Sequence, residues 1–282
     1  MKKIIQRLFI FFVGIPVLIT LVVFLPSYKH LCINIMVIIV SSLGAIEFQN
    51  ILKQKNLIIS LPEAAILGGL IHAVVTAAIS FNFNKIVLSL IFILGMSWLI
   101  LSRIFSPPAK QDSIIAKIAA GFSVLIYPGF LLSWIIPMAL LQRPELVIIL
   151  FFLMVFLNDS AAWAAGILLG KGNRGIIPAS PNKSLAGFIT GMIASLIVGT
   201  FGVYTFPISP HFFPPIGAGA ILGFFTGLAA ILGDLGESVL KRSAGIKDSG
   251  VLMPGRGGVL DSIDSLSLAA PVFFIAYNLL FA

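Results

Sequence analysis

Long apolar runs separated by short polar connections follow one another along the whole chain. Because a transmembrane helix needs about 20 apolar residues, these runs predict nine membrane-spanning helices. Their predicted ranges are 8–25, 31–50, 62–81, 86–105, 114–140, 145–169, 184–205, 215–238 and 263–281. The run 114–140 contains Tyr127-Pro128-Gly129, so we expect it to be kinked or split in two.

The composition agrees with an all-α polytopic membrane protein. Of the 282 residues, 59% are hydrophobic and 10% are charged, and the mean hydropathy is +1.11. A soluble domain carries about 25% charged residues, so this chain has too few charges to cover a surface that faces water. The first run lacks a small-residue cleavage site, so we expect an uncleaved span. The single Cys32 excludes a disulfide framework and a cysteine metal site.

The distribution of basic residues predicts the orientation. With the N-terminus in the cytoplasm, the outer loops hold only Lys29, Lys85 and Arg143 of the 18 Lys and Arg. The other 15 lie inside, as the positive-inside rule requires, so the C-terminus falls on the outer side. They are Lys2, Lys3, Arg7, Lys53, Lys55, Arg103, Lys110, Lys117, Lys171, Arg174, Lys183, Lys241, Arg242, Lys247 and Arg256. The net charge of +8 then reflects cytoplasmic loops and not nucleic-acid binding.

Polar chemistry is concentrated in the C-terminal half. Residues 1–141 hold about five spans, which we interpret mainly as scaffold facing lipid. Residues 142–282 hold about four spans and the two longest cytoplasmic connections, 170–183 and 239–262. We therefore expect the second region to be catalytic.

Two polar segments lie in and after the sixth span. Asp159 is an intramembrane carboxylate, which favours a functional site, although a helix–helix hydrogen bond is the alternative. Ser180 and Pro181 predict the N-cap and first helical position of the seventh span. Lys183 would then oppose the helix dipole, so it predicts a phosphate site with the backbone N–H groups. A lysine that snorkels to the interface is the alternative.

A third polar segment ends the eighth span. Asp234, Glu237 and Lys241 follow helical spacing and share one face. A salt-bridged helix end, in which Glu237 pairs with Lys241 and Arg242 favours the C-terminus, explains part of the pattern. It leaves Asp234 without an obvious partner.

The fourth segment combines glycines and carboxylates. The loop Pro254-Gly255-Arg256-Gly257-Gly258 lets backbone N–H groups approach a phosphate. Asp261 and Asp264 follow where the ninth span begins. The alternative is that Asp261 caps the helix and Asp264 complements its dipole.

Together the four segments indicate one kind of chemistry. Carboxylates without thiols or nearby histidines favour hard cations such as Mg²⁺, and basic side chains with glycine loops favour phosphates. The combination predicts metal-assisted phosphoryl or nucleotidyl transfer at the membrane surface.

The same segments resemble the phosphatidate cytidylyltransferase (CDP-diacylglycerol synthase) family. The family signature is S-x-x-K-R-x(4)-K-D-x(5)-P-G-H-G-G-x-x-D-R-x-D. Here it stands as Ser238-Val-Leu-Lys241-Arg242, Lys247-Asp248, Pro254-Gly255-Arg256-Gly257-Gly258 and Asp261-Ser262-Ile263-Asp264. Asp159-Ser160 and Ser180-Pro181-Asn182-Lys183 are similar to the family's intramembrane Asp and its S-P-x-K segment.

The resemblance implies Mg²⁺-dependent transfer of CMP from CTP to phosphatidic acid, giving CDP-diacylglycerol and pyrophosphate. It implies a homodimer in the bilayer of a bacterial inner membrane, an active site facing the cytoplasm, and no nucleic-acid partner. A second metal or a monovalent cation is an open expectation. Asp234, Asp261 and Asp264 would hold metal, and Asp159 and Lys183 would complete the catalytic set. The expected phosphate-binding residues are Ser180, Asn182, Lys183, Ser238, Lys241, Arg242, Lys247, Arg256, Gly257 and Gly258.

Three departures from the family pattern stand out. The family's His is Arg256 here, its Arg in D-R-x-D is Ser262, and the residues after Lys183 are Ser184-Leu185-Ala186-Gly187. Arginine cannot exchange a proton near neutral pH, so we expect Arg256 to supply the guanidinium that position 262 lacks. Two alternatives stay open at this point: another CTP-using lipid enzyme such as a polyprenol kinase, and an ion or anion transporter.

Overall fold

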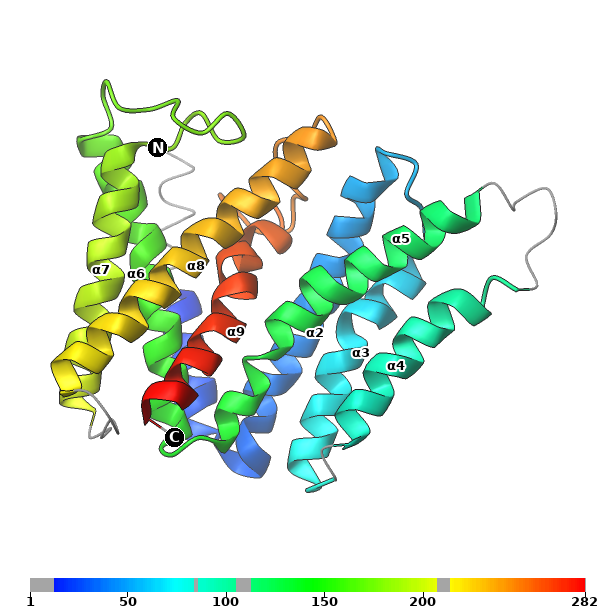
Figure 1. The fold of residues 1–282 in the computed structure, drawn as a ribbon, viewed down its shortest axis with the longest axis horizontal. Helices are drawn as coiled ribbons and strands as arrows, with labels where there is room; N and C mark the ends of the chain where they lie inside the picture. Colours follow the sequence, from blue (N-terminus) through cyan, green and yellow to red (C-terminus); the bar gives the residue numbers. More distant parts are fainter. Residues whose placement is uncertain (1–12, 84–85, 105–112, 207–213, 282) are drawn as a thin grey trace. The chain divides into compact units, whose positions relative to one another are not determined.

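The computed structural model describes residues 13–83, 86–104, 113–206 and 214–281, and every regular element in these ranges is helical (Figure 1). The elements are η1 (Thr20–Phe24), α2 (Ser27–Lys53), α3 (Leu61–Ser80), α4 (Ile86–Leu101), α5 (Ile114–Val124), η3 (Leu125–Leu131), η4 (Ile136–Leu140), α6 (Pro144–Leu168), α7 (Leu185–Thr205), α8 (Pro215–Ser243) and α9 (Leu260–Phe281).

Seven helical segments in the described ranges are long and apolar enough to cross a membrane. They are Ser27–Lys53, Leu61–Ser80, Ile114–Leu140, Pro144–Leu168, Leu185–Thr205, Pro215–Ser243 and Leu260–Phe281. The predicted spans 8–25 and 86–105 coincide with shorter apolar helices, Val13–Phe24 and Leu90–Leu101. The protein is thus an all-helical integral membrane protein, and the count of nine spans stays a prediction. Five residues of the orientation argument lie outside the described ranges: Lys2, Lys3, Arg7, Lys85 and Lys110.

The chain forms two compact units. One comprises Met1–Leu140 with Ser243–Ile263, and the other comprises Leu141–Arg242 with Asp264–Ala282. Most of the polar connection 239–262 therefore belongs with the N-terminal helices, although it follows α8 in sequence. The predicted division into a scaffold region, 1–141, and a catalytic region, 142–282, assigns functional roles to the two parts of the sequence. These roles stay a prediction.

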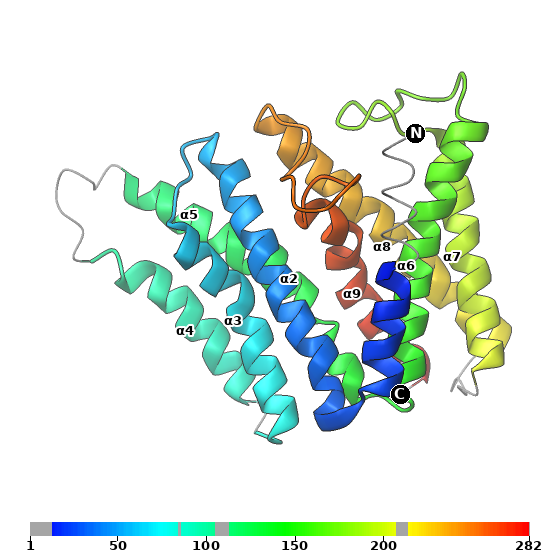
Figure 2. The same cartoon turned by 180° about the vertical axis from the view of Figure 1, so that it is seen from behind.

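In the first unit, α2 and α3 form a closely packed antiparallel pair (Figures 1 and 2). A Cβ atom on Gly68 would lie 2.4 Å from the Cβ of Ala45, so the two helices meet where side chains are small. The segment 114–140 is one kinked span, in which α5 continues into the π-helical turn η3 around Pro128. The Ser41 hydroxyl lies 2.7 Å from the Pro128 carbonyl oxygen and satisfies a carbonyl at the kink.

In the second unit, α7 and α8 approach each other through glycines. A Cβ on Gly199 would lie 2.3 Å from the Gly219 carbonyl oxygen, and one on Gly223 would lie 2.4 Å from the Ser195 carbonyl oxygen. Asn158 of α6 donates to Ser195 Oγ at 3.0 Å and to the Gly227 carbonyl oxygen at 3.3 Å. This buried amide joins three helices beside Asp159.

The predicted start of the seventh span at Ser180 is wrong. The helix begins at Leu185, and Ser184 is its N-cap, because the Ser184 hydroxyl accepts the Gly187 N–H at 3.1 Å. Ser180 instead opens a turn in which the Lys183 N–H donates to the Ser180 carbonyl. Pro181 takes the second position of that turn, where its fixed φ is also favourable. Pro181 therefore marks a turn here, four residues before the first residue of the helix.

Candidate functional site

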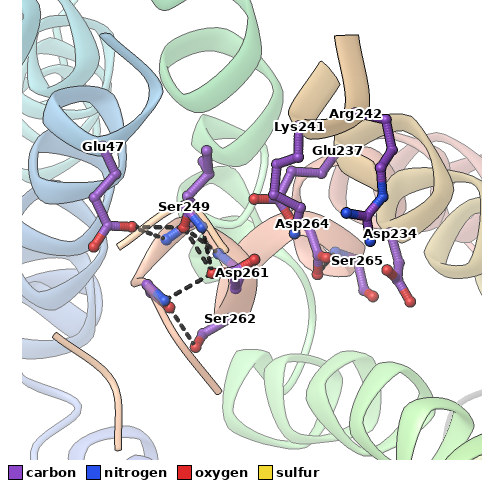
Figure 3. A network of polar contacts seen from close by, with 12 residues as sticks. Glu47, Asp234, Glu237, Lys241, Arg242, Ser249, Asp261, Ser262, Asp264 and Ser265 are labelled. Atoms are coloured by element: carbon purple, nitrogen blue, oxygen red, sulfur yellow. Dashed lines mark hydrogen bonds and ion pairs between the residues drawn. The ribbon is translucent and has the colours of Figure 1, made fainter. Parts of the chain in front are cut away.

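The second unit gathers four carboxylates, which we call the carboxylate cluster: Asp159 of α6, Asp234 and Glu237 of α8, and Asp264 of α9. Figure 3 labels Asp234, Glu237 and Asp264. Asp264 interacts electrostatically with the other three, and Ser265 Oγ donates to Asp159 Oδ1 at 3.3 Å. The approach of α8 to α9 is close, because a Cβ on Gly233 would lie 2.5 Å from the Asp264 carbonyl oxygen. Four carboxyl side chains thereby lie near one another, and the close approach at Gly233 brings those of α8 and α9 together.

Two lysines compensate this charge. Lys183 Nζ forms an ion pair with Asp234 Oδ2, and both side chains remain partly exposed. Lys241 Nζ pairs with Glu237 Oε2 at 3.1 Å, and Glu237 is completely buried. The predicted i, i+4 pair of Glu237 and Lys241 is confirmed. Asp234, for which the sequence suggested no partner, pairs with a lysine 51 positions away.

Arg242 contacts the connection before α7, and its predicted binding of phosphate is not tested by this contact. Its Nε donates to the Ala179 carbonyl at 3.2 Å, so it holds the end of α8 to the 170–183 connection. Ser180 and Asn182 lie on the turn before α7, and Ser238 is buried on α8. Binding of phosphate by Ser180, Asn182, Ser238 and Arg242 stays a prediction.

Asp261 belongs to a second set of contacts, in the first unit, which we call the Glu47 network. Its Oδ2 accepts the N–H groups of Gly258 at 2.7 Å and Ser249 at 2.9 Å. Ser249 Oγ lies 2.8 Å from the same oxygen and 3.0 Å from Glu47 Oε2. Figure 3 shows Ser249 between the two carboxylates. Asp261 therefore ties the loop to the first turn of α9, in place of the N-cap role considered from sequence.

The glycines before α9 are required by the approach of carboxylates. Gly257 has φ +114°, and a Cβ on it would lie 2.7 Å from Asp261 Oδ2. Gly258 uses its N–H for Asp261. Arg256 is half-buried in the turn closed by the Met253–Gly257 bridge, and Lys247 is exposed. Phosphate binding by Lys247, Arg256, Gly257 and Gly258 stays a prediction.

The donor chemistry fits magnesium. In the described part of the chain, no three His, Cys, Asp or Glu side chains converge closely enough to hold a metal ion by themselves. Magnesium, however, usually takes one or two carboxylates and completes its shell with substrate phosphates and water. Asp234 and Asp264, in one cluster, supply two such oxygen ligands. The predicted metal set of Asp234, Asp261 and Asp264 is not tested by these contacts.

Sequence reasoning missed Glu47. It lies in the predicted span 31–50 and is 4% exposed. A carboxylate inside a span is a functional signal by the same argument that singled out Asp159. Applied to every span, that argument would have found it.

Comparisons with known proteins identify the family of the chain. A sequence model of the cytidylyltransferase family matches residues 5–280. A phosphatidate cytidylyltransferase of Helicobacter pylori is 34% identical over 218 residues, which cover 73% of this chain and 79% of that protein. Phosphatidate cytidylyltransferases of Synechocystis and Staphylococcus aureus are 40% identical over 129 and 124 residues. These alignments cover 46% and 44% of this chain, and 42% and 46% of those proteins. The chain belongs to the cytidylyltransferase family.

Proposed function

We propose that this protein transfers CMP from CTP to phosphatidic acid and produces CDP-diacylglycerol and pyrophosphate for phospholipid synthesis. The family match over nearly the whole chain supports this activity, as do the relatives named for it. The observation that carries it is the carboxylate cluster with Lys183 and Lys241, since it combines metal ligands with phosphate partners. The kinase and transporter alternatives have no comparable support.

The reaction needs no protein nucleophile. A phosphate oxygen of phosphatidic acid attacks the α-phosphorus of CTP, and the bond from that phosphorus to the oxygen bridging to the β-phosphate breaks. Pyrophosphate leaves with the electron pair of that bond. Lys183, Lys241 and Arg242 would bind and orient the phosphates, so catalysis rests on positioning and electrostatic stabilisation.

Magnesium, when bound, would neutralise the charge that develops on the transferring phosphoryl group and on pyrophosphate. From the family resemblance we propose Asp234, Asp261 and Asp264 as its ligands and Asp159 as a supporting residue, with a second metal or a monovalent cation left open. In this proposal Lys183 would exchange its ion pair with Asp234 for a substrate phosphate, which would leave the Asp234 carboxylate able to hold the metal.

The proposed setting is the inner membrane of a bacterium, with nine spans, the N-terminus in the cytoplasm and the site on that side. The 15 to 3 distribution of Lys and Arg supports this orientation. A homodimer is proposed from the family resemblance.

The test is an assay of the purified protein in mixed micelles with CTP, phosphatidic acid and either Mg²⁺ or EDTA. We expect CDP-diacylglycerol and an equal amount of pyrophosphate, formed only with Mg²⁺. No lipid product with Mg²⁺ would refute the proposal. In a parallel assay with a polyprenol in place of phosphatidic acid, release of CDP together with a phosphorylated polyprenol would favour the kinase alternative.

A further inference from the structure

Glu47 is a buried carboxylate on a helix of this membrane protein, and the proposed chemistry does not use that helix. It lies on α2 and is 4% exposed. Burying a carboxylate is costly unless hydrogen bonds compensate it. A buried ionisable group is often less stable than a well-packed apolar residue of the same size. Its presence therefore suggests a purpose other than the stability of α2.

The contacts of Glu47 all lead to the segment around Asp261. Its Oε2 accepts the Leu260 N–H at 2.8 Å, at the first residue of α9. The same oxygen lies 3.0 Å from Ser249 Oγ, which lies 2.8 Å from Asp261 Oδ2. Ser249 has one hydroxyl proton and can donate to one carboxylate at a time. The Asp261 N–H also donates to Ser249 Oγ at 3.3 Å.

The loop is shaped around the Glu47 carboxylate. A Cβ on Gly250 would lie 2.3 Å from Glu47 Oε1, and one on Gly258 would lie 2.2 Å from Oε2. A side chain at either position would displace the Glu47 carboxylate from the place that it occupies here. Gly250 and Gly258 flank the region that contains Arg256. Gly258 lies two residues before Leu260 and three before Asp261.

We propose that Glu47 is a positioning residue: through Ser249 and the Leu260 N–H it fixes the 249–261 segment and so sets the position of Asp261. This inference rests on the proposed function, in which Asp261 takes part in the chemistry. An N-terminal helix thereby fixes a segment that follows α8 in sequence but belongs to the same unit as α2. The role is one of hydrogen-bond acceptance, and Glu47 itself touches no substrate.

The proposal predicts different results for different substitutions. Glu47→Ala removes the acceptor, and Glu47→Asp withdraws it by one methylene group, so each should lower kcat about tenfold or more, the effect of losing hydrogen bonds to a charged group. Glu47→Gln keeps an acceptor oxygen and should retain activity within about threefold. Gln49→Ala is the matched control, because Gln49 is buried on the same helix and donates to the Leu57 carbonyl instead.

Limited tryptic digestion gives a second readout that does not depend on activity. Lys247 is exposed and lies just before the segment that Glu47 holds. Glu47→Ala and Ser249→Ala should speed cleavage after Lys247 and Arg256 in the detergent-solubilised protein, while Glu47→Gln and Gln49→Ala should not. Digestion compared at equal content of folded protein, measured by gel filtration, separates this effect from global unfolding.

The outcomes distinguish the two proposals. If the wild-type protein makes no CDP-diacylglycerol, the proposed function fails, and digestion alone decides whether Glu47 holds the segment. If Glu47→Ala equals Gln49→Ala in both assays, the positioning role is refuted. Equal losses for Glu47→Gln and Glu47→Ala would also refute it, because they would show that charge and not hydrogen-bond acceptance matters.

Discussion

Asp234 and Asp261 are the carboxylates on which the proposed chemistry depends most, and each has a defined environment. Asp234 pairs with Lys183, and Asp261 accepts two backbone N–H groups. Asp234→Asn and Asp261→Asn should each lower the rate of CDP-diacylglycerol formation at least ~100-fold, the scale for losing a group that stabilises charge. Glu145→Gln, in the first turn of α6, is the control. Near-normal rates for either Asn variant would remove that residue from the metal site.

Arg256 and Ser262 are the positions where the chain departs from the family pattern. Ser262 Oγ donates to the Gly258 carbonyl at 3.2 Å, so this serine has a local partner that an arginine would lose. We expect Arg256→His combined with Ser262→Arg to retain activity in the CTP assay. Ser262→Arg alone should bring no improvement. Full activity of Arg256→Ala would show that Arg256 does not replace the missing guanidinium.

The residue contacts that sequence could predict are the local ones. Glu237 and Lys241 are four positions apart on a helix, so their pairing follows from helical geometry. The pairing of Lys183 with Asp234 and the contact of Glu47 with Leu260 depend on how distant segments pack. No spacing rule in a single sequence reports such contacts.

At the level of elements, hydrophobic runs located the seven long apolar helices of the described ranges well and their ends less well. The eighth span was predicted to end at 238, where the apolar run stops, yet α8 continues to Ser243. The polar residues after 238 stay in the helix, and the i, i+4 pair of Glu237 with Lys241 stabilises this last part. The ninth was predicted from 263, and α9 begins at Leu260, whose N–H group donates to Glu47. Asp261 accepts the Gly258 N–H just before the helix. The first polar residues after an apolar run show where the membrane-spanning part ends. The helix itself ends or begins where side chains hydrogen-bond its terminal backbone groups.

The approach of α7 to α8 leads to a stability prediction. Gly199→Ala would place a Cβ 2.3 Å from a backbone oxygen of α8, so the helices must separate. We expect the midpoint of thermal unfolding in detergent to fall by roughly 3–8 °C. Gly236→Ala on α8 is the control, since its added Cβ meets nothing within 4 Å. A lower midpoint for Gly236→Ala than for Gly199→Ala would contradict this packing.

For the whole molecule, the predicted orientation can be tested directly. Cys32 is the only cysteine, so Cys32→Ser gives a background for single-cysteine variants. In intact cells a membrane-impermeant thiol reagent should label Arg143→Cys, and it should label Lys171→Cys and Lys247→Cys only after permeabilisation. The reverse pattern would invert the topology and place the proposed site on the outer face.

The composition was sufficient to predict a polytopic helical protein, but not how the chain divides into units. Residues 243–263 pack with the N-terminal helices although their motif continues from α8. Glu47 supplies part of the reason, because a single buried carboxylate on α2 binds both Ser249 and Leu260. Such long-range partnerships organise the molecule and leave only weak signals in one sequence.

The position of the transferred phosphorus tests the central claim most directly. Parallel reactions with phosphatidic acid and Mg²⁺ would use CTP labelled in the α-phosphate or in the γ-phosphate. The account predicts that the α-label appears in the lipid fraction and the γ-label in pyrophosphate, with both transfers lost in Asp234→Asn. Recovery of the γ-label in lipid, or of neither label, would contradict it.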